Sequence, residues 1–209
     1  MKHLVIVGAG ELGRELFWTI QGSLGFGTEY DVKGYIDDDD SEEKIGLLSA
    51  PYLGAISSYV VEEGDVFTCA IASPGTREKV VNIMIDKGAS FINVIHSTCI
   101  VHGTAKLGTG IILSPYTIIG DASVIGDYMV LNGFSSIGHD CRIGDHTCIM
   151  SHCDITGHTQ IGKKVFIGGG AQTVPGAKIG DEAYVGAGSV ILRKVKAGTK
   201  VFGNPAKAL

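Results

Sequence analysis

The stretch that decides the fold lies at residues 135–160 and reads SSIGHDCRIGDHTCIMSHCDITGHTQ. An isoleucine recurs here at every sixth position from Ile137 to Ile155. The same frame runs from Ile95 to Ile191, and every residue in it is aliphatic except Thr173. Glycine often follows the aliphatic residue, and a small residue usually stands two positions before it. A period of six matches neither a 3.6-residue helix nor the simple alternation of a hairpin strand.

A chain with this period is expected to wind around a triangular prism, with one short strand and one turn on each face. The aliphatic residue points into a narrow core, the small residue fits beside it, and glycine eases the turn. Three hexads close one coil, so residues eighteen positions apart lie above one another at about 4.8 Å. The regularity resembles the hexapeptide-repeat left-handed parallel β-helix, which is the all-β fold we expect for residues 93–209. A purely structural solenoid, such as an ice-binding or scaffold protein, is the alternative.

The quoted stretch is also rich in residues that bind metals: His139, Cys141, His146, Cys148, His152, Cys153 and His158. Three of the histidines occupy the same place in consecutive hexads, and no two of them are eighteen residues apart. They are therefore expected to point from three different sides of the prism. Cys141 and Cys153 are twelve residues apart at a position that prefers small inward-facing residues. The pattern argues against a zinc site within one chain and leaves open a site shared between subunits.

His139 falls at a different place in its hexad and is followed by Asp140. A carboxylate beside an imidazole fixes its tautomer and raises its basicity, as a general base near neutral pH requires. Gly157 lies eighteen residues further on, so we expect its backbone N–H near the reacting centre. An exposed turn histidine is the alternative, and spacing alone does not decide between the two.

The composition limits the classes of function. Hydrophobic residues make up 44% and charged residues 19%, which is typical of a globular protein, and 31 glycines among 209 residues indicate many tight turns. The net charge of -5, without a dense Lys/Arg run, argues against nucleic-acid binding. No segment approaches the ~20 apolar residues of a membrane span. The five cysteines are an odd number without a secretory context, so we expect a cytoplasmic protein with reduced thiols.

Residues 1–92 predict a small α/β domain with a parallel sheet. We expect strands at 3–7, 32–36, 66–72 and 90–94, and helices from about residue 11 and at 77–87. The first turn contains the pattern G-x-G-x-x-G at Gly8, Gly10 and Gly13, which brings backbone N–H groups toward a phosphate. The acids from Asp37 to Asp40 follow the second strand, where a ribose-binding acid lies in a dinucleotide fold. The length suits one nucleotide better than NAD, and a purely structural turn is the alternative.

Together the two parts resemble the bacterial sialic acid O-acetyltransferase and UDP-4-amino-sugar N-acetyltransferase family, which includes enzymes of the bacillosamine pathway. The resemblance covers almost the whole chain. It rests on GAGELG (8–13), YIDDD (35–39), HSTCIVHGTAKLGTG (96–110), LNGFSSIGHDCRIGD (131–145), IGGGAQTVPGAKIGDEAYVGAGSVI (167–191) and VFGNPAKAL (201–209). It implies acetyl-CoA-dependent N-acetylation of a nucleotide-linked 4-amino-4,6-dideoxy sugar. It also implies a Rossmann-like nucleotide-sugar-binding domain, a homotrimer with active sites between subunits, and no metal.

The resemblance assigns roles to particular residues, with His139 as the general base and Asp140 as its partner. It places the nucleotide-sugar at Gly10, Glu11, Leu12, Gly13, Asp37, Asp38, Asp39 and Ala72. It places acetyl-CoA at Cys148, Gly169, Ala187, Gly203, Pro205 and Lys207. Two positions depart from the family: Cys148 stands where a second histidine often contacts acetyl-CoA, and Ala72 stands where many relatives have glycine.

The expected mechanism is direct transfer of the acetyl group, without an acyl-enzyme intermediate. Cys148 as a nucleophile is a rival, but the sequence supplies no base to activate it. Two other functions are alternatives: O-acetylation of sialic acid or another hydroxyl acceptor, and a non-catalytic trimeric nucleotide-binding scaffold.

Overall fold

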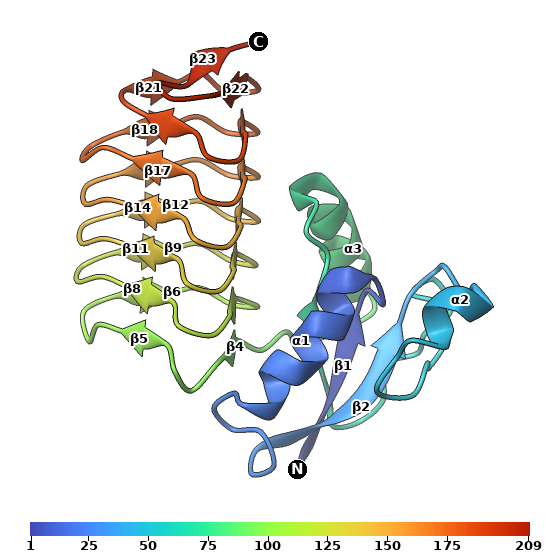
Figure 1. The fold of residues 1–209 in the computed structure, drawn as a ribbon. Helices are drawn as coiled ribbons and strands as arrows, with labels where there is room; N and C mark the ends of the chain where they lie inside the picture. The colour runs from blue at the N-terminus through green and yellow to red at the C-terminus, as the bar shows by residue number, and fades with distance from the viewer. The chain divides into compact units, whose positions relative to one another are not determined.

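The computed structural model describes residues 1–209 and divides them into two compact units, Met1–Ser97 and Thr98–Leu209 (Figure 1). The division falls five residues beyond the boundary expected after residue 92. The reason is that the chain just before residue 98 hydrogen-bonds back to the end of the first helix. The N–H of Leu24 donates to the carbonyl of Ile95, and the N–H of Ser97 donates to the carbonyl of Gly22, both at 2.9 Å.

The first unit is built on three parallel strands in the order β2-β1-β3. The central strand carries a continuous apolar run, Leu4 to Val7, that is completely buried, as is typical of a parallel strand covered on both faces. The elements of this unit are β1 (Lys2–Val7), α1 (Glu11–Gln21), β2 (Tyr30–Ile36), α2 (Glu42–Ile45), β3 (Asp65–Cys69), α3 (Pro74–Asp86) and β4 (Val94–Ile95). None of the helices is both long enough and apolar enough to cross a membrane.

Most of these elements lie within a few residues of their expected positions, and two differ. Of the strand expected at 90–94, residues 90–93 form only a single bridge, between Phe91 and Phe67, and Val94 begins β4. The short helix α2 was not expected, because the acidic run before it reads as a loop. The sheet is therefore smaller than the four-stranded sheet that the sequence predicts.

The second unit is a left-handed parallel β-solenoid whose short strands stack along three faces (Figure 1). We number these faces 1 to 3 in the order in which the chain meets them within a coil. Face 1 contains β7 (Ile112–Leu113), β10 (Val130–Leu131), β13 (Cys148–Ile149), β16 (Phe166–Ile167), β19 (Tyr184–Val185) and β22 (Lys200–Phe202). Face 2 contains β5 (Ile100–Val101), β8 (Ile118–Ile119), β11 (Ser136–Ile137), β14 (Asp154–Ile155), β17 (Gln172–Thr173) and β20 (Val190–Ile191). Face 3 contains β6 (Lys106–Leu107), β9 (Val124–Ile125), β12 (Arg142–Ile143), β15 (Gln160–Ile161), β18 (Lys178–Ile179) and β21 (Lys194–Val195).

The six-residue frame accounts for the core of the solenoid. The second residue of nearly every strand is the repeated aliphatic one; Ile137, Ile149 and Ile155, for example, are completely buried. Burying a side chain of this size stabilises the fold by about 1.5–3 kcal/mol. Strands pair in register with the strand eighteen residues away, as Cys148 does with Val130 on one side and Phe166 on the other. The stacking that the period predicts is therefore confirmed.

Thr173, the exception in the frame, is buried and tied to its neighbours by hydrogen bonds. Its hydroxyl accepts the backbone N–H of Thr156 at 3.0 Å and lies 3.1 Å from the hydroxyl of Thr159. A polar side chain is tolerated in the core here because neighbouring groups satisfy it.

The frame predicted to run from Ile95 to Ile191 continues beyond Ile191 after a shorter step. Val195 follows Ile191 by four residues, pairs with Ile179, and is followed six residues later by Val201. Both valines are buried. The last coil is therefore two residues shorter than the others. An antiparallel strand, β23 (Lys207–Ala208), then covers the edge of β22.

Candidate active site

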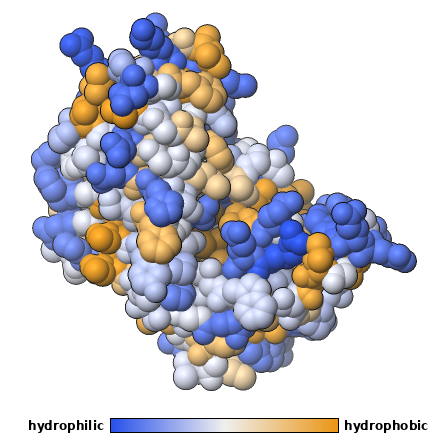
Figure 2. Space-filling view, in the orientation of Figure 1, coloured by the Kyte–Doolittle hydropathy of each residue, from blue (hydrophilic) through white to orange (hydrophobic).

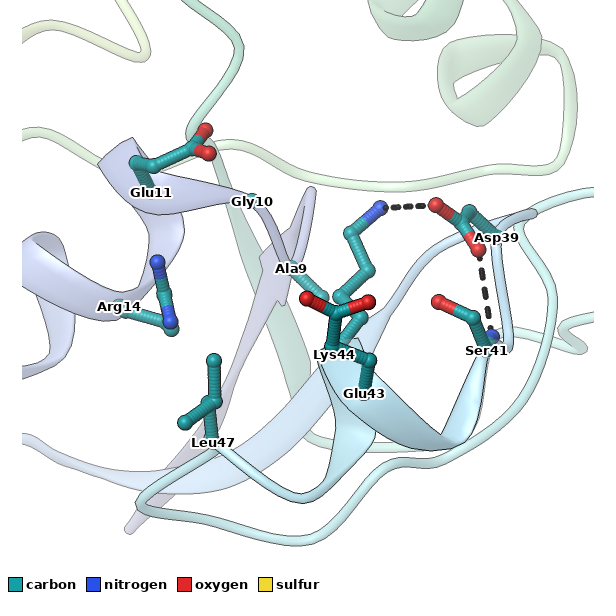
Figure 3. Close-up of a pocket in the computed structure, with 9 residues that line it drawn as sticks. All are labelled: Ala9, Gly10, Glu11, Arg14, Asp39, Ser41, Glu43, Lys44 and Leu47. Carbon is teal, nitrogen blue, oxygen red and sulfur yellow. Dashed lines mark hydrogen bonds and ion pairs between the residues drawn. The ribbon is translucent and has the colours of Figure 1, made fainter.

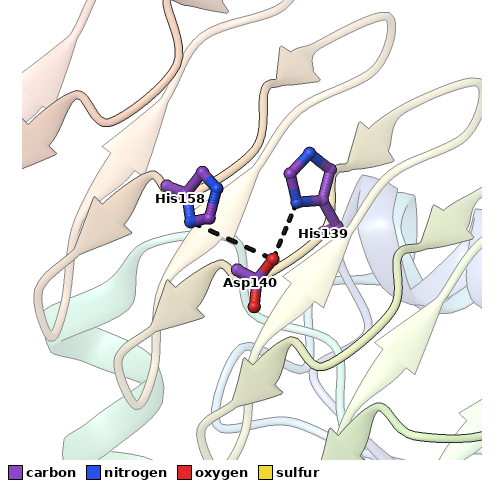
Figure 4. Close-up of side chains that lie close together, drawn as sticks. All are labelled: His139, Asp140 and His158. Carbon is purple, nitrogen blue, oxygen red and sulfur yellow. Dashed lines mark hydrogen bonds and ion pairs between the residues drawn. The ribbon is translucent and has the colours of Figure 1, made fainter.

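The predicted base and its partner lie at the corner between faces 2 and 3, in the turn from β11 to β12. Nδ1 of His139 is 2.8 Å from Oδ2 of Asp140 (Figure 4). The turn brings the two side chains together because Asp140 takes a left-handed backbone conformation, with φ 57°. The side chain of His139 is 60% exposed, so its other ring nitrogen, Nε2, remains accessible to a ligand.

The charge state of the pair suits a base. The hydrogen bond from His139 lowers the pKa of Asp140 below the ordinary carboxyl value, and the charge of His158 acts in the same direction. An ionised carboxylate accepts a hydrogen bond from the Nδ1–H of His139. That tautomer leaves a lone pair on Nε2, which is the arrangement needed to accept a proton.

A third residue, His158, joins the pair. It is eighteen residues from Asp140, and its Nδ1 lies 3.9 Å from the same Oδ2 (Figure 4). The rings of His139 and His158 meet edge to face, with centroids 4.9 Å apart. This neighbour was not predicted, because no two of the three equivalent histidines are eighteen residues apart. The eighteen-residue spacing, applied to Asp140, identifies it.

Gly157 lies directly against the ring of His139. A methyl group on Gly157 would be 2.6 Å from Nε2 of His139 and 2.8 Å from its Cε1, so only glycine fits without moving the ring. The N–H of the next residue, His158, donates to the carbonyl of His139 at 2.9 Å, whereas the N–H of Gly157 has no acceptor within the chain. A free backbone donor therefore lies next to the proposed base.

The remaining histidines of the stretch lie at the other two corners, as expected. His146 stacks on Tyr128 with ring centroids 4.9 Å apart, and His152 stacks on Phe134 at 5.2 Å. The prediction that the three equivalent histidines do not converge on one another is therefore correct.

The cysteines of the stretch are buried and lack the environment of a nucleophile. Burial raises the pKa of Cys141, and it raises the pKa of Cys153 to about 11. Their sulfur atoms lie 3.2 Å from the carbonyl oxygens of Thr156 and Gly168, respectively. Cys148, on β13, is also fully buried.

The residues that the resemblance assigns to acetyl-CoA fall into two groups. Gly169 and Ala187 lie at the corner between faces 1 and 2 in consecutive coils, where the N–H of Gly188 donates to the carbonyl of Gly169 at 2.9 Å. The second group lies at the C-terminal end of the solenoid. There Gly203 has φ 100°, a cis peptide bond precedes Pro205, and Lys207 begins β23. Pro205 also lines a cavity of about 350 Å³ formed with residues 191–195 and Ala206.

In the first unit, the glycine turn between β1 and α1 borders a pocket of about 410 Å³ (Figure 3). Its lining residues are Ala9, Gly10, Glu11, Arg14, Asp39, Ser41, Glu43, Lys44 and Leu47. Gly10, Glu11 and Asp39 are among the residues predicted from the resemblance. Four further lining residues were not predicted because they belong to the unexpected helix α2 and its flanks: Ser41, Glu43, Lys44 and Leu47.

The three glycines of the motif differ in their surroundings. Gly8 has φ 102°, a conformation that favours glycine. A methyl group on Gly13 would clash with the carbonyl oxygen of Gly8, so the close approach of α1 to the turn requires glycine there. Gly10, in contrast, has an extended backbone, and a methyl group added to it would meet no atom within 4 Å. The fold requires Gly8 and Gly13, whereas Gly10 leaves open space on the pocket side.

The acids after β2 hold this region together. Asp37 accepts the backbone N–H of Ala9 at 2.7 Å, which fixes the glycine turn. Lys44 lies between two carboxylates, 3.1 Å from Asp37 and 3.2 Å from Asp39. Figure 3 shows its contact with Asp39. Asp38 accepts the N–H of Ser57 at 3.0 Å. Asp39 is therefore the one of the three acids that lines the pocket.

Two other predicted substrate residues lie outside the pocket lining. Leu12 belongs to the first turn of α1, and Ala72 follows β3. The carbonyl of Ala72 lies 3.3 Å from a guanidinium nitrogen of the buried Arg77, so the backbone after β3 is held from within the unit.

Comparison with known proteins agrees with this architecture. The family model "Bacterial transferase hexapeptide (six repeats)" matches residues 158–193. No curated protein sequence matches the chain.

Several solved structures match over the full length of the chain, among them the following three. PerB from Caulobacter crescentus, solved in complex with CoA and GDP-perosamine, is 27% identical, with 100% of this chain and 98% of that chain covered and a TM-score of 0.89. The acetyltransferase domain of PglB from Neisseria gonorrhoeae, in complex with acetyl coenzyme A, is 25% identical, with coverages of 100% and 99% and a TM-score of 0.87. WeeI from Acinetobacter baumannii is 26% identical, with both chains covered completely and a TM-score of 0.87.

The repeat and the full-length fold thus point the same way, and a mutant form of the Caulobacter protein is described as a perosamine N-acetyltransferase. The chain thus carries a hexapeptide repeat of the bacterial transferase type and shares its full-length fold with this sugar N-acetyltransferase.

Proposed function

We propose that the protein is an acetyl-CoA-dependent N-acetyltransferase that acts on the amino group of a nucleotide-linked 4-amino-4,6-dideoxy sugar. The observation that carries the proposal is the exposed His139–Asp140 pair, whose Nε2 lies close to Gly157, a residue with an unpaired backbone N–H. This pair occurs on a fold that matches PerB, a protein that binds CoA and GDP-perosamine, over its whole length.

The residues of the corner can perform the transfer directly. Nε2 of His139 accepts a proton from the amino group as its nitrogen forms a bond to the thioester carbon. Asp140 stabilises the resulting imidazolium through the 2.8 Å hydrogen bond to Nδ1. The N–H of Gly157 donates to the negative charge that develops on the thioester oxygen. The carbon–sulfur bond then breaks, and CoA leaves as the thiol with the proton that His139 returns.

We propose that the first unit is a small Rossmann-like domain that binds the nucleotide part of the substrate. Gly10 supports this, because its backbone at the N-terminus of α1 faces the pocket with open space around it. Phosphate groups bind at helix N-termini through unpaired N–H groups and the helix dipole. The lining also holds the cations Arg14 and Lys44 among three acids, and Lys44 is paired with Asp37 and Asp39.

An acetyl-CoA thiol-release assay with a panel of acceptors tests the function. The panel contains UDP-, dTDP- and GDP-linked 4-amino sugars and free sialic acid. We expect turnover with at least one amino sugar and little with sialic acid. Turnover with sialic acid alone would establish the O-acetyltransferase. Nucleotide binding without turnover of any acceptor would favour the non-catalytic scaffold.

We further propose that the protein is a homotrimer with active sites between subunits. Apolar residues reach the surface (Figure 2), and several of them gather on the early coils of face 2 and its edge. Ile100 and Tyr116 are more than half exposed, and so is Phe134, which stacks on Tyr116 at 5.0 Å. Exposed apolar clusters of this kind mark protein contacts.

The trimer predicts a solution mass near three times 21.9 kDa, measured by light scattering after gel filtration. Ile118→Lys, on β8 of the same face, is expected to lower this mass, because a buried lysine would lack a partner. A wild-type mass of a single chain would contradict the trimer.

A further inference from the structure

We propose that His139, Asp140 and His158 also form a binding site for a divalent transition-metal ion such as Zn²⁺, and that metal bound there blocks the base. Each residue offers one ligand atom, and these atoms all lie within 4.8 Å of one another. Both imidazole rings turn their Nδ1 toward the same carboxylate oxygen (Figure 4). The binding of metal stands on this geometry alone, whereas the block of the base rests on the proposed function.

The distances suit a small ion after a minor adjustment. Zn²⁺ binds nitrogen and oxygen ligands at about 2.0–2.2 Å, so two ligands in a tetrahedral site lie about 3.3 Å apart. The distances from Oδ2 of Asp140 are 2.8 Å to His139 and 3.9 Å to His158, one below and one above that value. The side chain of His158 is 63% exposed, so a small rotation of its ring can shorten the longer distance while His139 stays in place.

The chemistry of the ligands favours Zn²⁺ and similar ions over Mg²⁺ or Ca²⁺. Two imidazole nitrogens and one carboxylate oxygen suit borderline transition metals, whereas Mg²⁺ and Ca²⁺ prefer oxygen alone. Three protein ligands with an open fourth position are also typical of accessible zinc sites. No other group of three His, Cys, Asp or Glu side chains in the chain brings its ligand atoms this close.

Metal binding and base catalysis require opposite tautomers of His139. As a base, the ring carries its proton on Nδ1, which donates to Asp140, and keeps a lone pair on Nε2. A metal bound at Nδ1 uses the lone pair of that nitrogen, and the ring proton must then be on Nε2. Nε2 becomes a donor and no longer accepts the proton of the substrate amine. The inhibition therefore follows from the position of one proton.

Calorimetric titration of the EDTA-dialysed full-length protein with ZnCl₂, without substrates, tests the site. We expect one Zn²⁺ per chain and binding at least about tenfold weaker for His158→Asn, which removes one ligand. His152→Asn is the matched control, because His152 has the same backbone conformation (φ 61° against 60°) at a different corner. The control is expected to bind Zn²⁺ like the wild type.

Three results would overturn the site. The first is no binding by the wild type at about 100 μM Zn²⁺. The others are unchanged binding by His158→Asn and equal weakening by His158→Asn and His152→Asn. Inhibition is scored separately, as the ratio of acetyl-CoA turnover with and without Zn²⁺. We expect this ratio to fall for the wild type and to stay closer to one for His158→Asn. Because binding is measured without acceptor, it stands or fails independently of the acetyltransferase activity.

Discussion

His139→Ala is expected to lower kcat for acetyl transfer by about 10²- to 10⁴-fold, the usual contribution of a positioned general base. The variant removes the only group at this corner whose ring nitrogen is fixed by a 2.8 Å hydrogen bond to a carboxylate and is open to a ligand. KM for acetyl-CoA is expected to change little, because His139 acts mainly in the transition state. Thiol release at saturating acetyl-CoA measures both quantities.

Gly157→Ala provides an independent check with the base intact. Its methyl group would lie 2.6 Å from Nε2 of His139, so the ring must turn away and kcat is expected to fall. His3→Ala, on β1 of the first unit and outside the pocket lining, is the control and should leave kcat unchanged. If His139→Ala retains turnover within about threefold of the wild type, His139 is not the base.

Gly13→Ala and Gly10→Ala are expected to differ in their effect on the free energy of unfolding, although both glycines belong to one motif. A methyl group on Gly13 overlaps the carbonyl of Gly8, so Gly13→Ala should destabilise the first unit by about 1–3 kcal/mol or more. Gly10 has open space and an extended backbone, so Gly10→Ala should change the free energy of unfolding by less than about 0.5 kcal/mol. Urea unfolding followed by circular dichroism compares the two.

Gly10→Ala, which should hardly change stability, is expected to weaken the binding of the nucleotide-sugar. The methyl group of Gly10→Ala occupies the space through which a phosphate reaches the backbone of the turn, so nucleotide-sugar affinity should fall at least about tenfold in a protein that remains folded. Calorimetry with the nucleotide-sugar identified by the acceptor panel measures this loss. Unchanged affinity of Gly10→Ala would show that the turn has only a structural role.

Much of the fold follows from the sequence because the solenoid is repetitive. Each coil contacts only its neighbours, so a six-residue period specifies the strands, the corners and the stacking together. The pairing of His139 with Asp140 was predictable for the same reason, since both belong to one turn. The frame was less informative after Ile191, where a step of four residues replaces six.

The first unit was predictable only in outline. Its strands carry clear apolar runs and α1 has a clear apolar face, whereas the residues of the pocket lining follow no such pattern. Arg14 and Lys44 line the same pocket but come from segments about thirty residues apart, and the helix that carries Lys44 has only four residues. No local pattern brings such residues together.

By itself, the sequence of this protein determined the prism, its register and one imidazole–carboxylate pair, because all three depend on residues close in the chain or at a fixed period. The tertiary structure decided which neighbours complete the site. It places His158 beside Asp140 and Gly157 in contact with the ring of His139. It also leaves space beside Gly10, whereas Gly13 packs against the carbonyl of Gly8. These distinctions depend on the distances between atoms of separate coils and turns, which a one-dimensional pattern does not contain.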